Sequence, residues 1–177
     1  MVDDQEHLND IRSRKGQINS QNHSDFISEA GRCLGCNFIC NKCVEVCPNR
    51  ANVSIEINSN LFKDKYQIIH LDALCNECGN CATFCPYHGA PYKEKITLYW
   101  SEEEFKNGSN DGFFFRTGTD QNQTMLDVRW KMEDGIIVLA ENGEVVETSF
   151  KLNTERDEFE KLTELINSVR KSYSYLF

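Results

Sequence analysis

The feature that most constrains this chain is the cysteine run from Cys75 to Pro86, spaced C-x2-C-x2-C-x3-C-P. This spacing is typical of segments that wrap a [4Fe-4S] cluster. Three thiolates must reach three corners of one small cube, so the backbone between them must curl tightly. Gly79 suits the curl because it adopts positive φ without a Cβ clash, and Asn80 tolerates such angles better than most residues. Pro86 then prevents the turn from continuing as a helix.

Another cysteine run, from Cys33 to Pro48, comes earlier in the chain, so it is the first run and the run from Cys75 to Pro86 is the second. In bacterial-type ferredoxins with two clusters, the fourth cysteine of a run ligates the other cluster, so one run predicts a partner run. The C-terminal half of the first run, Cys40-x2-Cys43-x3-Cys47-Pro48, matches the same template. Its N-terminal half departs from the template, because three residues rather than two separate Cys36 from Cys40.

Together the runs predict two [4Fe-4S] clusters with crossed ligands. One cluster is expected on Cys36, Cys40, Cys43 and Cys85, and the other on Cys47, Cys75, Cys78 and Cys81. Cys33, the ninth thiol, either replaces Cys36 or lies unligated beside the site. Irons held entirely by thiolate leave no open coordination position, so we expect electron exchange and assign no catalytic residue. The apolar side chains expected to exclude water from the clusters are Phe38, Ile39, Val44, Val46, Phe84 and Tyr87.

Two other readings of the cysteines stay open. Repeated C-x2-C pairs also build four-cysteine zinc sites, which would make this a zinc-stabilised interaction module. A redox enzyme that uses Cys33 or an incompletely ligated cluster as its reactive centre is the second alternative. Disulfides are disfavoured, because nothing marks secretion and nine cysteines cannot all pair.

Composition and charge limit the partners and the cellular location expected of the protein. The chain has 177 residues and a net charge of -9. It has no basic patch with interleaved aromatic residues, which argues against a nucleic-acid partner. The longest aliphatic run, residues 136–140, is far too short to span a bilayer, and no signal peptide is visible. Nine thiols predict a reducing, cytoplasmic location. The acidity is typical of electron carriers that dock on basic partners, and equally of any soluble protein.

The expected fold class is α+β, with a bacterial-type two-cluster ferredoxin domain followed by a small antiparallel β-sheet and a C-terminal helix. We expect a flexible lead-in over residues 1–23, the ferredoxin-like domain over 24–92 and an accessory or docking domain over 93–177. Ser24 is a plausible cap for a short helix leading to Cys33. Between the cysteine runs, alternating apolar residues predict strands over 53–57 and 66–71.

The last third of the chain has strand, turn and helix signals but no cysteine. Strands are expected over residues 95–100, 112–116, 125–131, 136–140 and 144–150. Ser101 and Glu104 form a capping-box pattern, and Asn142-Gly143 is a hairpin signal. Thr154 is a candidate cap for a helix whose apolar face comprises Phe159, Leu162, Leu165, Ile166, Val169 and Tyr173.

Several phrases resemble known iron–sulfur proteins. Residues 29–36, Glu-Ala-Gly-Arg-Cys-Leu-Gly-Cys, resemble iron–sulfur segments of glutamate synthase small subunits and dihydropyrimidine dehydrogenases. Residues 43–53, 70–73 with 75–81, and 91–93 resemble the C-terminal end of the "putative selenate reductase" subunit family. That resemblance covers roughly residues 26 to 177.

The resemblance implies a role in electron transfer between larger partners. Members of that family are large flavoproteins with iron–sulfur segments, associated with selenate reduction and with anaerobic purine metabolism alongside molybdenum-containing partners. This chain has no Gly-rich dinucleotide fingerprint, so the flavin and nicotinamide machinery of the family is not expected here. The implied role is an iron–sulfur module, either a split subunit or fragment or a standalone protein, that relays electrons between a flavoprotein and a terminal reductase or dehydrogenase.

Overall fold

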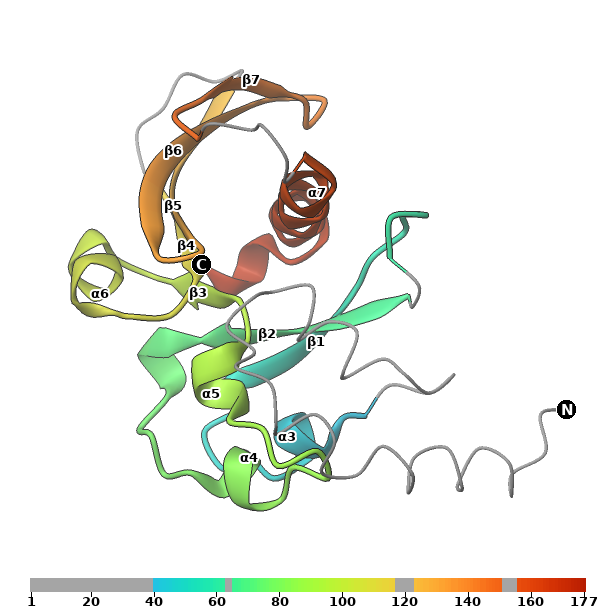
Figure 1. Ribbon diagram of the computed structural model, residues 1–177, viewed down its shortest axis with the longest axis vertical. Helices are drawn as coiled ribbons and strands as arrows, with labels where there is room; N and C mark the ends of the chain where they lie inside the picture. Colours follow the sequence, from blue (N-terminus) through green and yellow to red (C-terminus); the bar gives the residue numbers. More distant parts are fainter. Residues whose placement is uncertain (1–39, 63–64, 117–122, 151–155) are drawn as a thin grey trace, which may run out of the picture.

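The computed structural model describes residues 40–62, 65–116, 123–150 and 156–177 (Figure 1). These residues form a seven-stranded sheet with the strands in chain order. The strands are β1 (Asn52–Glu56), β2 (Tyr66–Leu71), β3 (Thr97–Tyr99), β4 (Gly112–Phe115), β5 (Gln123–Trp130), β6 (Glu133–Ala140) and β7 (Val145–Thr148). The described helices are α3 (Lys42–Glu45), α4 (Asn80–Thr83), α5 (Pro91–Glu94), α6 (Glu102–Asn107) and α7 (Arg156–Ser172), with short 3-10 turns η2 (Asp72–Leu74) and η3 (Ser174–Leu176).

The sheet is mixed, which differs from the antiparallel sheet expected from the sequence. β1 pairs with β2 antiparallel, β2 with β3 and β3 with β4 parallel, and the remaining neighbours antiparallel. The parallel pairs arise because long connections carrying α4 with α5, and then α6, return the chain to the same end of the sheet. The α+β class is confirmed, whereas the division at residues 23/24 and 92/93 stays a prediction.

Helix α7 covers one face of the sheet. In Figure 1 it lies on the concave side of the curved strands β4 to β7. The predicted apolar face is confirmed, since Phe159, Leu162, Leu165, Ile166 and Val169 are buried and Tyr173 packs against the same core. Their partners from the sheet are Ile55, Ile69, Leu71, Leu98, Phe113, Phe115, Leu126, Val128, Trp130, Ile137 and Leu139. The predicted cap Thr154 lies outside the described residues.

Strand β2 faces two different environments, and this positions the candidate site. Successive side chains of a strand point to opposite faces. Ile69 and Leu71 therefore belong to the core under α7, whereas Ile68 packs with Cys43 and Cys81 in a separate small cluster. His70 shares the face of Ile68 and is also buried. The strand thus separates the α7 core from the cysteine-bearing segments.

Two local signals in the sequence are confirmed. Ser101 caps α6, with its hydroxyl accepting from the Glu104 backbone N–H and the Glu104 carboxylate accepting from the Ser101 N–H. Gly143 has φ +95° in the turn between β6 and β7, as the Asn-Gly hairpin signal predicts. The short helix expected after Ser24 lies outside the described residues.

A hydrogen bond ties the C-terminal segment to the edge strand β1, which leads out of the first cysteine run. The Glu56 backbone N–H donates to the Tyr173 hydroxyl at 2.7 Å. We expect Tyr173→Phe to lower the free energy of unfolding by about 1 kcal/mol, because it removes one net hydrogen bond. Tyr175→Phe is the matched control, since Tyr175 is 74% exposed. Chemical denaturation followed by circular dichroism measures both; equal stabilities for the two variants would contradict this role of Tyr173.

Candidate metal centre

The two cysteine runs adopt the same local structure, as far as they are described. In each run a one-turn helix carries the cysteine that comes before the Cys-Pro pair. These cysteines are Cys43 in α3 and Cys81 in α4, each 6% exposed. A Cys-Pro pair follows, and the third residue after the cysteine, Arg50 or His88, has φ 58° in both runs. The same local structure therefore occurs twice, although the second copy continues into α5 rather than directly into a strand.

The tight curl predicted for the run from Cys75 is present. Gly79 has φ +77° and immediately precedes α4, as expected for a residue chosen for positive φ. The second left-handed residue is Glu77, with φ 52°, rather than Asn80, which begins the helix. The sequence could not identify Glu77, because a glutamate has no special preference for this conformation.

Four of the predicted ligands surround one pocket. Cys47 from the first run and Cys75, Cys78 and Cys81 from the second all line it. The other lining residues are Asn49, Ala51, Asn52, His70, Asn76, Glu77, Gly79 and Tyr92. The structure therefore brings together, from both runs, the four cysteines that the sequence assigned to one cluster. Their role as ligands stays a prediction.

The thiols in this pocket are placed to receive hydrogen bonds. The Ala51 backbone N–H donates to Cys47 Sγ at 3.2 Å, and the Glu77 N–H donates to Cys75 Sγ at 3.3 Å. Burial raises the pKa of the Cys75 and Cys81 thiols; the Glu77 N–H opposes the shift at Cys75, and Tyr92, Asn52 and Ala82 oppose it at Cys81. Bound metal deprotonates a coordinating thiol, so the same sulfurs would act as thiolates once ligated.

A cluster and a single metal ion make different demands on this donor set. In the described part of the chain, no three His, Cys, Asp or Glu side chains stand close enough together to hold one metal ion. A cube of four irons uses one thiolate per iron, so its ligands surround a space instead of meeting at a point. Four thiols around a pocket, with backbone N–H groups directed at two of the sulfurs, fit such a group.

The other predicted ligand set is described only in part. Cys40, Cys43 and Cys85 are described, whereas Cys36 and its alternative Cys33 lie outside the described residues. Val44 and Val46 pack in the cluster around Cys43 and Cys81, and Tyr87 is buried, as expected of residues that exclude water. Phe84, at the C-terminal end of α4, is 56% exposed, so the structure does not support its predicted shielding role. Phe38 and Ile39 lie outside the described residues.

Sequence reasoning missed two polar residues in the pocket wall. Asn52 and His70 are 2% and 1% exposed, and they face each other across β1 and β2. Burial lowers the pKa of His70 to about 4, so its ring is neutral at neutral pH. The alternation of β2 could have placed His70 opposite Ile69, but only the strand register shows that it lies beside Asn52.

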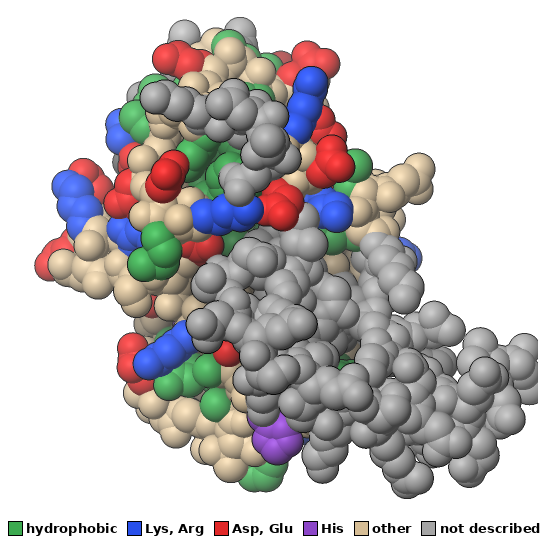
Figure 2. Space-filling model, in the orientation of Figure 1, with side chains coloured by type: hydrophobic (Ala, Val, Ile, Leu, Met, Phe, Trp, Pro, Cys, Tyr) green, Lys and Arg blue, Asp and Glu red, His purple; other side chains and the backbone are tan. Residues whose placement is uncertain are grey.

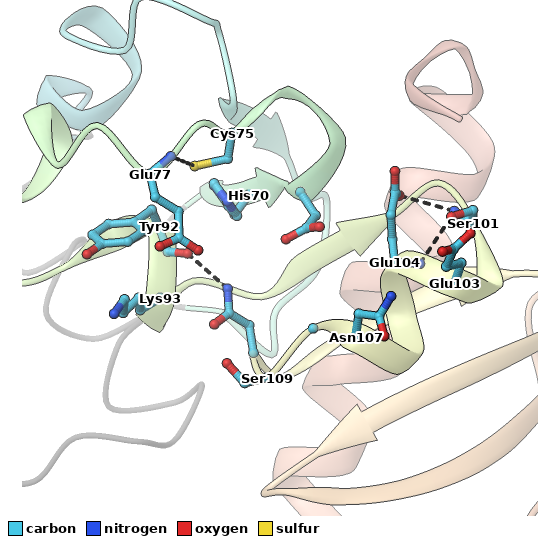
Figure 3. A pocket seen from close by; sticks show the side chains of 13 residues that line it. His70, Cys75, Glu77, Tyr92, Lys93, Ser101, Glu103, Glu104, Asn107 and Ser109 are labelled. Atoms are coloured by element: carbon cyan, nitrogen blue, oxygen red, sulfur yellow. Dashed lines mark hydrogen bonds between the residues drawn. The ribbon is translucent and has the colours of Figure 1, made fainter.

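A polar cleft adjoins the cysteine pocket (Figure 3). The two share His70, Cys75, Glu77 and Tyr92, and the cleft extends from there to the α6 side. Burial, Glu104 and Glu77 raise the pKa of Asp72 in this cleft. One edge of the cysteine pocket is therefore open to a hydrated, acidic surface.

The surface charge is mixed on the face that Figure 2 shows. Lys and Arg side chains are interspersed with Asp and Glu side chains there. Among the described helices, none combines the length and the apolar character that crossing a bilayer requires.

Comparison with known proteins gives one kind of match. The chain is 54% identical over 110 residues to the Escherichia coli K12 protein named "Putative oxidoreductase YgfK", and equally to its counterpart in Escherichia coli O157:H7. The aligned segment covers 59% of this chain and 10% of each relative, so the chain spans about a tenth of the length of the curated relatives it matches. No protein-family model and no solved structure matches the chain. The aligned residues are thus homologous to a segment of a protein named as an oxidoreductase.

The left-handed glycine before α4 offers a test of the curl around Cys75 to Cys81. A Cβ at Gly79 would meet no atom within 4 Å, so Gly79→Ala introduces backbone strain without a clash. We expect a loss of stability of about 1 kcal/mol and faster release of iron to a chelator. Asn80→Ala is the control, because Asn80 already has helical geometry. Thermal unfolding and chelator kinetics measure the effect; identical behaviour of both variants would contradict a conformational requirement at Gly79.

Proposed function

We propose that this chain holds two [4Fe-4S] clusters and serves as an electron-transfer module of an oxidoreductase. The observation that carries the proposal is the pocket lined by Cys47 together with Cys75, Cys78 and Cys81. A cysteine from one run beside three from the other is the crossed pattern of two-cluster domains. The homology to a segment of a protein named as an oxidoreductase supports the same role.

The residues of the chain would perform three tasks in this role. The eight cysteines hold the irons: Cys47, Cys75, Cys78 and Cys81 at one cluster, and Cys36, Cys40, Cys43 and Cys85 at the other, with Cys33 as the alternative to Cys36. Backbone N–H groups at Ala51 and Glu77 stabilise negative charge on the sulfurs. Val44, Val46 and Ile68 limit access of water. When bound, the clusters supply one-electron oxidation and reduction.

The proposed partners are proteins rather than small substrates. Complete thiolate ligation leaves no iron open to a substrate, so electrons must enter and leave through docked proteins. The family resemblance points to a flavoprotein as donor or acceptor and to a molybdenum-containing reductase or dehydrogenase as the terminal partner. The abundance of thiols favours the reducing environment of the cytoplasm. Selenate- and purine-linked anaerobic metabolism is the setting that the resemblance suggests.

The composition of the purified protein tests this proposal. Protein purified without oxygen should contain about eight irons and eight acid-labile sulfides, with a broad visible absorption that bleaches on reduction. Iron, sulfide and zinc analysis on the same sample makes the measurement. Stoichiometric zinc without sulfide would overturn the proposal and favour a zinc-stabilised interaction module. Substrate turnover that depends on Cys33 would instead indicate an enzyme.

A pair of single variants decides which of the first two thiols is a ligand. We expect Cys36→Ser to lose about four irons and Cys33→Ser to retain about eight. Replacing a thiol that ligates a cluster releases that cluster, whereas replacing a thiol that does not ligate leaves both clusters bound. Iron content by elemental analysis, normalised to protein, gives the answer. Loss at Cys33 with retention at Cys36 would reverse the assignment.

A further inference from the structure

The buried pair Asn52 and His70 links the two cysteine runs. Both residues line the pocket of Cys47, Cys75, Cys78 and Cys81, and both are almost completely removed from solvent. Burying polar side chains is costly unless their hydrogen bonds are made, so their partners define their role.

The hydrogen bonds fix the orientation of the Asn52 amide. Asn52 Nδ2 donates to the Cys43 carbonyl oxygen at 3.1 Å. A carbonyl can only accept, so the NH2 group must face Cys43 and Oδ1 must face His70. His70 Nδ1 lies 3.0 Å from Asn52 Oδ1. Since Oδ1 is an acceptor, Nδ1 carries the proton and holds the amide in this orientation.

The second N–H of the same amide is available to the other cysteine run. Asn52 and Cys81 line the same pocket; burial raises the pKa of the Cys81 thiol, and the Asn52 side chain lowers it as a hydrogen-bond partner. One side chain thus donates to the backbone of Cys43 in the first run and lines the pocket together with Cys81 of the second. Cys43 and Cys81 also pack in one apolar cluster.

We propose that Asn52 is a positioning residue that donates an N–H to the Cys81 sulfur and raises the reduction potential of the cluster on Cys47, Cys75, Cys78 and Cys81. His70 acts through Asn52 by holding its amide in the donating orientation. Reduction adds negative charge to the cluster and its sulfurs, so a directed N–H stabilises the reduced state more than the oxidised state. This inference rests on the proposed function, because it presupposes that the cluster is bound.

The test compares reduction potentials of full-length variants purified without oxygen. Asn52→Leu keeps approximate shape and removes the donor; we expect one cluster to titrate at a more negative potential than in wild type and the other to be unchanged. Asn167→Leu is the matched control, because Asn167 is also buried, at 8% exposure, and donates to the Gly143 carbonyl in the α7 region. Its potentials should equal those of wild type.

A second pair of variants tests His70. We expect His70→Leu to shift the same cluster in the same direction and His70→Gln to restore the potential, because the Gln amide can donate to Asn52 Oδ1. If Asn52→Leu fails to retain iron, this pair decides the question. Unchanged potentials in Asn52→Leu, or in His70→Leu, with full iron content would overturn the inference.

Iron and sulfide analysis separates the two proposals. If wild-type protein contains no iron or sulfide, the proposed function is contradicted, and this inference is contradicted with it. Wild-type protein with both clusters but equal potentials across the variants would overturn the role of Asn52 and His70 alone.

Discussion

The structure depends on bringing Cys47 beside Cys75, Cys78 and Cys81 although 27 residues separate Cys47 from Cys75. The antiparallel pairing of β1 with β2 achieves this. β1 begins just after Cys47 and β2 ends just before Cys75, so their register places the end of one run beside the start of the next. The Leu71 N–H donates to the Ala51 carbonyl at 2.7 Å, which closes the pair at the pocket end. The hairpin is therefore part of the site.

The two faces of β2 bury very different amounts of apolar surface. Its Ile69 and Leu71 face belongs to a large apolar core under α7, whereas its Ile68 and His70 face meets only a small cluster around Cys43 and Cys81. A domain face with so little buried apolar surface would gain stability from the proposed clusters, because ligation favours the folded state. In this account α7 and the curved sheet provide a stable scaffold. The proposed clusters would stabilise the Ile68 and His70 face of β2, where little apolar surface is buried.

Local features of the fold could be predicted from the sequence, because their causes are local. The strain-free glycine at 79, the capping box at Ser101, the Asn-Gly turn and the apolar face of α7 each depend on residues a few positions apart. The parallel pairing of β2, β3 and β4 could not be predicted, since strand order depends on contacts between residues far apart in the chain. The site divides in the same way: spacing identified the cysteines, but only the β1–β2 register reveals Asn52 and His70. Phe84 was misassigned because apolar character alone does not specify how exposed a side chain is at the end of a one-turn helix.

Crossed ligation is the central claim, and the iron content of paired Cys→Ala variants tests it most directly. Cys47 and Cys81 belong to different runs but to the same proposed cluster, so the double variant should retain about four irons, no fewer than either single variant. Cys43 and Cys47 belong to one run but to different proposed clusters, so that double variant should retain almost none. The reverse result, with the Cys43 and Cys47 pair losing one cluster and the Cys47 and Cys81 pair losing both, would show that each run binds its own cluster and would contradict the account.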